Sequence, residues 1–144
     1  MTKMIHSFWA YLVLLLLIIS IFNAIKGLRS KRDFTAKDLR ISLFTLIVSH
    51  IQLVIGLVAY YMSNYYTTMR SIGMGEVMKN SELRKPLVEH PIMIIIAVVL
   101  LTIGFSKMKR KETDRGKFKS VLIYYSLALL LILAMIPWDL WFTA

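Results

Sequence analysis

The chain contains no cysteine, only eight acidic residues and only three prolines among its 144 residues. Without cysteine it can form no disulfide, no thiolate metal site and no cysteine-based catalytic centre. Its sequence also lacks the glycine-rich phosphate loops, nucleophile–base sets and metal-hydrolase motifs that mark common enzymes. The sequence therefore predicts no hydrolase or transferase, and a redox role would require a bound cofactor.

Hydrophobic residues are abundant instead, and they are gathered into four long runs. The hydrophobic fraction is 58% and the mean hydropathy is +0.65, whereas soluble domains are about 45–50% apolar. Each run can cross a hydrocarbon core of about 30 Å. We therefore expect an all-α fold, an integral membrane four-helix bundle forming one domain over residues 1–144. Its spans are predicted at 8–25, 41–63, 91–106 and 120–142.

Basic residues are concentrated in two short connections between these runs. The net charge is +10, and thirteen of the eighteen Lys and Arg residues lie within 26–40 and 107–119. This distribution is the positive-inside pattern of membrane proteins. It predicts that both connections face the cytoplasm, with both termini and the 64–89 connection outside. The partner of the basic residues is then the lipid bilayer and not nucleic acid.

The 64–89 connection and the helix ends carry further signals. Glycines at 73 and 75 interrupt the connection, and we expect a short surface helix over 76–85. Pro91 suits the first turn of the third helix, and Pro137 is expected to kink or fray the fourth. An aromatic belt on the outer side is predicted from Trp9, Tyr11, Trp138 and Trp141.

The only three histidines lie in or at the ends of the apolar runs. An ionisable side chain at membrane depth is energetically costly and usually faces the bundle interior. At a rise of 1.5 Å per residue, His6 and His90 lie roughly 30 and 25 Å above the basic side, and His50 only roughly 15 Å. We therefore expect His6 and His90 to share one ligand. His50 should stand apart near the midplane.

Helical spacing places the outer histidines on inward stripes. Small residues on such stripes allow close helix packing in a membrane bundle. The stripes comprise His6, Ala10, Val13, Leu17, Ser20 and Ala24 in the first helix and His90, Ala97, Leu101 and Gly104 in the third. The second helix has a polar stripe of Thr45, Ser49, Gln52 and Gly56. Its Ser49 and Gln52 are expected to make interhelical hydrogen bonds, and quinone or haem-propionate binding is the alternative.

The leading hypothesis from these residues is haem b bound in the bundle. Membrane b-type haems are held by inward-facing histidines from two helices, and neutral imidazole is a good iron ligand. His6 with His90 is the pair that matches in depth. His50 with His90 is the alternative pair if the second helix is shifted along its axis.

Several stretches resemble a family of small bacterial four-span proteins that are labelled cytochrome B or cytochrome b-like. The resemblance runs along the whole chain and includes 5–7 (IHS), 49–53 (SHIQL), 73–81 (GMGEVMKNS), 88–90 (VEH) and 136–138 (IPW). It implies histidines at the positions of His6, His50 and His90. It also implies electron transfer and a place in the bacterial inner (cytoplasmic) membrane as a multi-pass protein.

Two further hypotheses remain open at this point. The chain could be a cofactor-free accessory or structural subunit, with other subunits of a larger membrane complex, such as a respiratory one, as partners. It could also handle copper, because methionine and histidine are ligands for Cu(I). The methionines predicted toward the outer side are Met1, Met4, Met62, Met69, Met74, Met78, Met93 and Met135. Glu89 is expected to form a salt bridge with Arg84 or Lys85.

Overall fold

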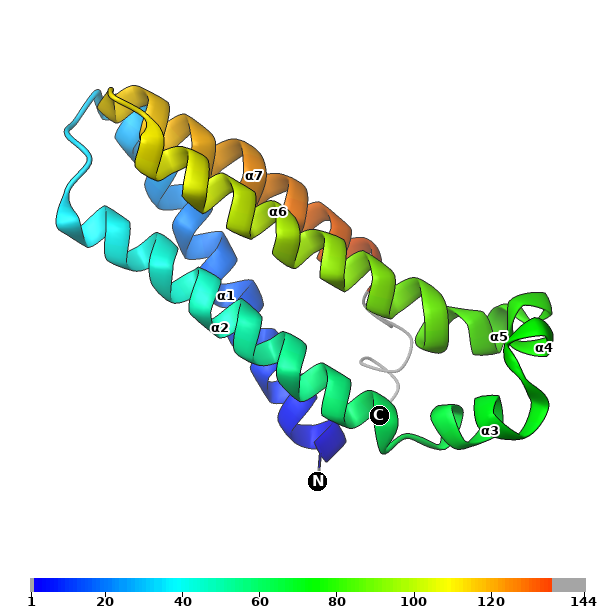
Figure 1. Cartoon of the computed structure of the whole chain (residues 1–144). Helices are drawn as coiled ribbons and strands as arrows, with labels where there is room; N and C mark the ends of the chain where they lie inside the picture. The colour runs from blue at the N-terminus through cyan, green and yellow to red at the C-terminus, as the bar shows by residue number, and fades with distance from the viewer. Residues whose placement is uncertain (1, 136–144) are drawn as a thin grey trace.

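The computed structural model describes residues 2–135, and every regular element in that part of the chain is helical (Figure 1). A π-helical turn, Lys85–Glu89, joins the fifth helix to the sixth. The helices are α1 (Thr2–Ser30), α2 (Ala36–Tyr61), α3 (Asn64–Ile72), α4 (Met74–Lys79), α5 (Ser81–Arg84), α6 (His90–Arg110) and α7 (Asp114–Met135). The end of the fourth predicted run, with Pro137, Trp138 and Trp141, lies outside the described residues, as does Met1.

Four stretches of helix are long and apolar enough to cross a membrane, as the sequence predicted. They are Met4–Ser30, Ala36–Tyr61, Ser81–Arg110 and Asp114–Met135. Each extends beyond its apolar run into the basic connections, because Lys and Arg are good helix formers. The all-helical class and the four membrane-length helices are therefore confirmed.

The four long helices pack in the cyclic order α1, α2, α6, α7. The α6–α7 pairing is the most extensive and the α2–α6 pairing the least. The predicted inward stripes are confirmed, since the core contains Val13, Leu17, Ser20 and Ala24 of α1, Thr45, Ser49 and Gln52 of α2, and Ala97, Leu101 and Gly104 of α6.

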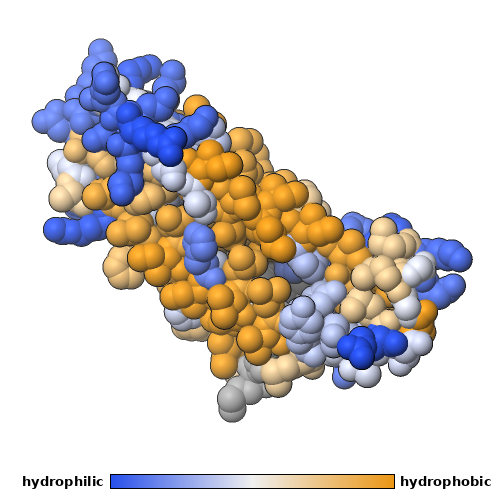
Figure 2. Space-filling model, viewed as in Figure 1, coloured by the Kyte–Doolittle hydropathy of each residue, from blue (hydrophilic) through white to orange (hydrophobic). Residues whose placement is uncertain are grey.

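Both basic connections lie at the same end of the bundle, and the N-terminal turn of α1 lies at the other end with α3, α4 and α5 (Figure 1). Figure 2 shows an apolar band between two hydrophilic ends. This is the surface that a bilayer-spanning bundle requires, because lipid tails solvate apolar side chains and not charged ones.

A buried carboxylate ties α1 to α2 at the basic end. Asp38 is 2% exposed, and it accepts hydrogen bonds from Arg32 at 2.8 and 2.9 Å and from Asn23 at 2.7 Å. The backbone N–H of Thr35 adds a bond of 2.8 Å, which completes a capping box at the start of α2. The hydrogen bond to Asp38 raises the pKa of Arg32 above its usual value. The pair therefore stays ionised, and together with Asn23 it links the end of α1 to the start of α2.

The connection at the other end differs from the expected single helix over 76–85. Asn80 adopts an extended conformation (φ −114°, ψ 111°) and separates α4 from α5. Its side-chain oxygen accepts from the backbone N–H groups of Glu82 and Leu83, so it ends one helix and caps the next. The predicted salt bridge between Arg84 and Glu89 is confirmed, at 2.6 Å.

Candidate histidine site

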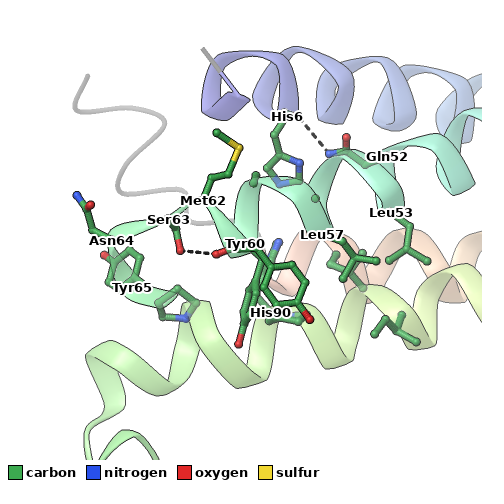
Figure 3. A pocket seen from close by; sticks show the side chains of 17 residues that line it. His6, Gln52, Leu53, Leu57, Tyr60, Met62, Ser63, Asn64, Tyr65 and His90 are labelled. Atoms are coloured by element: carbon green, nitrogen blue, oxygen red, sulfur yellow. Dashed lines mark hydrogen bonds between the residues drawn. The ribbon is translucent and has the colours of Figure 1, made fainter. Parts of the chain in front are cut away.

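The two histidines that were expected to share a ligand lie close together. His6 projects from the first turns of α1, and His90 is the first residue of α6. Their ring centroids are 6.4 Å apart, and the ring planes are perpendicular. Both side chains are half-buried. Figure 3 shows His6 pointing from α1 toward His90.

His90 is held by the end of α7. Its Nδ1 lies 2.9 Å from the carbonyl oxygen of Met135. A carbonyl oxygen can only accept, so Nδ1 carries the proton and Nε2 keeps its lone pair. Histidines that bind metals are commonly oriented in this way, through a hydrogen bond from the nitrogen that does not bind.

The backbone before His90 is shaped by proline and by a tyrosine of α2. Pro91 has no N–H, so the carbonyl of Leu87 loses its usual partner four residues along the helix. The chain relaxes into the π-helical turn, in which the N–H of His90 bonds to the carbonyl of Lys85. The Tyr60 hydroxyl donates to the Leu87 carbonyl at 2.8 Å. Tyr60 therefore ties the end of α2 to the π-helical turn before α6.

His6 is held against the middle of α2. The side-chain nitrogen of Gln52 donates to the His6 backbone carbonyl at 3.0 Å. One turn further on, a Cβ built on Gly56 would lie 3.3 Å from Cε1 of the imidazole. The lack of a side chain at Gly56 thus leaves room for the His6 ring beside α2. Three residues of α2 at intervals of four therefore border the histidine pair: Gln52, Gly56 and Tyr60.

The two rings border a pocket of about 570 Å³. This volume falls within the range of about 300–1,000 Å³ that is usual for small-molecule and cofactor sites. Figure 3 shows the pocket between α1, α2 and α6, with Tyr60 beside His90. The rest of its wall is largely apolar and includes Leu53, Leu57, Ala59, Ile94 and Ile95, although Ser63 and Asn64 also line it.

His50 does not line this pocket. Its side chain is exposed on the bundle surface, with Nδ1 2.8 Å from the carbonyl of Leu46 in its own helix. Its Nε2 lies 3.5 Å from the hydroxyl of Thr102 in α6. The structure therefore brings His6 to His90 and not His50 to either of them. His50 instead makes a polar contact across the α2–α6 seam.

Two residues of the polar stripe of α2 were predicted to make interhelical hydrogen bonds, and one of them does. Gln52 does make an interhelical hydrogen bond, to α1. The prediction for Ser49 is wrong, because its hydroxyl donates to the Thr45 carbonyl of the same helix at 2.7 Å. Thr45 makes the other interhelical bond, with the Ser20 hydroxyl at 2.7 Å. Sequence reasoning missed the role of Tyr60, for which the only signal was the proline at 91.

The donor set limits which ligands the pair suits. Within residues 2–135, no group of three or more His, Asp or Glu side chains is placed to hold a metal ion. A structural zinc site takes four protein ligands, so two imidazoles alone suit a metal whose other ligands come from elsewhere. In comparisons with known proteins, no family model, no curated protein and no solved structure matches the chain.

Proposed function

We propose that this protein is a membrane-embedded, b-type cytochrome-like protein in which His6 and His90 hold haem b. The observation that carries the proposal is the approach of the two rings to 6.4 Å at the edge of an apolar pocket. Two imidazoles that bind one metal on opposite sides, with metal–nitrogen bonds of about 2.0–2.1 Å, have centroids roughly 6 Å apart. The observed separation fits this requirement.

The pocket also fits a porphyrin in chemistry. Aliphatic side chains of α2 and α6 form much of its wall, which also includes Ser63 and Asn64, and a largely apolar surrounding suits a macrocycle that is itself largely apolar. When bound there, haem b would supply one-electron transfer to and from a partner subunit, such as one of a respiratory complex. The chain's own residues do three things. They would present two imidazoles, they orient the His90 ring through Met135 and hold the His6 backbone through Gln52, and they border the site with aliphatic side chains.

The charge distribution supports an orientation for this site. Both basic connections would face the cytoplasm and anionic headgroups, in the inner membrane of a bacterium. The N-terminal turn, α3, α4, α5 and the histidine pair would then lie on the extracytoplasmic side. The chain has no native cysteine, so single cysteines placed at 30–38 can be labelled in intact cells. Reaction with an impermeant reagent added from outside would overturn this orientation.

Reduced-minus-oxidised absorption spectra of the protein purified from native membranes test the haem proposal. A Soret band with sharp α and β bands, and stoichiometric iron, is the expected result. Colourless, iron-free protein would overturn the proposal. In that case, stoichiometric copper would favour copper handling, for which Met62 at the pocket wall is a soft donor. Co-purification of a larger complex without any cofactor would favour an accessory subunit.

A further inference from the structure

Gln52 is the most buried polar residue that lines the pocket. It is 9% exposed, and its amide nitrogen donates to the carbonyl oxygen of His6. That carbonyl can only accept, so the bond determines which end of the Gln52 amide is nitrogen. The other end, Oε1, is therefore an acceptor.

Two polar atoms at this point have no hydrogen-bond partner. Within the described residues, the buried side-chain N and O atoms without a partner are Nδ1 of His6 and Oε1 of Gln52. Their chemistry is complementary, since an imidazole nitrogen can carry a proton and an amide oxygen can only accept one. A buried polar atom left unpaired destabilises the folded protein. Pairing these two atoms removes that cost from both side chains at once.

We infer that Gln52 is the positioning residue of His6. A small rotation of the two side chains, whose Nδ1 and Oε1 atoms are unpaired in the structure, would let Oε1 accept the proton on Nδ1 and leave the lone pair on Nε2 of His6 for the pocket. The carbonyl of Met135 holds His90 in the same tautomer. Each ring then offers its outer nitrogen, one anchored by a backbone carbonyl and the other by a side-chain amide. The role of this arrangement in haem binding rests on the proposed function. The tautomer assigned to His6 does not depend on it.

The surrounding of His6 agrees with this assignment. Gly56 allows the His6 ring to lie against α2. The same helix carries Gln52 (Figure 3). The Gln52 amide would thus bond to both the backbone carbonyl and the imidazole of His6. A ring held at both points cannot rotate freely about its χ angles, and an unrestrained ring would bind a metal more weakly.

The test is ¹⁵N histidine NMR of the haem-free protein in detergent, which reports which ring nitrogen carries the proton. The expected result is an Nδ1–H tautomer for His6 in the wild type and in Gln52→Glu, which keeps an acceptor oxygen. Gln52→Leu should shift His6 toward a mixture of tautomers. Ser49→Ala is the matched control, since Ser49 is buried one turn away and bonds only within its own helix. It should leave the His6 signals unchanged.

Haem titration of the same variants completes the test. Gln52→Leu should bind haem roughly 10–100-fold more weakly than the wild type, and Gln52→Glu should recover most of that loss. An Nε2–H tautomer of His6 in the wild type overturns the inference, and so does a tautomer that Gln52→Leu leaves unchanged. If the wild type shows the expected tautomer and binds no haem, the positioning role of Gln52 stands and the proposed function falls.

Discussion

His6 and His90 meet with perpendicular rings and centroids 6.4 Å apart, and each lies at the N-terminal end of its helix, in two helices that are far apart in the chain. Neither ring is placed by its own helix alone. α7 holds His90 through Met135, and α2 holds His6 through Gln52. The pair is therefore a product of all four long helices, and its sensitivity to substitution should extend well beyond the two histidines.

Substitution of the three histidines should separate the pair from His50. His6→Ala and His90→Ala should each abolish the Soret and α bands of the purified protein, because each removes one of the two imidazoles proposed to hold the haem. His50→Leu should keep the full spectrum and lose no more than about 1 kcal/mol of stability, as expected for one interhelical hydrogen bond in a membrane. If His50→Leu loses the bands while His6→Ala and His90→Ala keep them, His6 and His90 are not the haem ligands.

A methyl group at Gly56 should weaken binding without weakening the fold. Gly56→Ala places a Cβ about 3.3 Å from Cε1 of His6, so the ring must move away from α2. Alanine also favours the helix over glycine by about 1 kcal/mol. We expect unchanged or higher thermal stability together with roughly tenfold weaker haem binding. In Gly75→Ala the new Cβ meets no atom within 4 Å, so this control should bind normally.

The Tyr60 hydroxyl should prove necessary for the geometry at the start of α6. Tyr60→Phe removes the donor to the Leu87 carbonyl and should lower the free energy of unfolding by about 1 kcal/mol. It should also broaden the low-spin EPR signal of the bound haem, because the turn before His90 loosens. Tyr61→Phe keeps the ring contacts of Tyr61 with Tyr60 and Tyr66 and serves as the control. Equal effects of the two variants would argue against a specific role for Tyr60.

The ion pair at the basic end should contribute to stability and not to the site. Arg32→Ala leaves the Asp38 carboxylate, 2% exposed, without its cation, and should cost roughly 3 kcal/mol in unfolding experiments in detergent. Arg29→Ala removes an exposed charge from the same end and should change stability by no more than about 0.5 kcal/mol. The absorption spectrum of any bound haem should be the same in both variants.

Helical periodicity explains why the inward faces could be predicted. A membrane helix has only one surface that contacts other helices closely, and small and polar residues gather there. Ser20, Thr45 and Ala97 each fall on a predicted stripe and are buried. The same reasoning could not choose the partners of the polar groups. Ser49 bonds within its own helix and Gln52 bonds to α1, a difference that depends on how far each lies from the neighbouring backbone.

The amino-acid sequence by itself determined the four apolar helices, their inward stripes and the similar depth of His6 and His90, because these follow from composition and from a constant rise per residue. Only the tertiary structure decided the rest. It placed His50 against Thr102, divided the 76–85 segment at Asn80 and brought Gln52, Gly56 and Tyr60 of α2 to the two histidines. These relationships depend on helix rotation, on the π-helical turn before Pro91 and on the packing of α2 against α1 and α6. Helix rotation, the turn and the packing are set by contacts between distant segments of the chain. The periodicity of a single helix carries no information about those contacts.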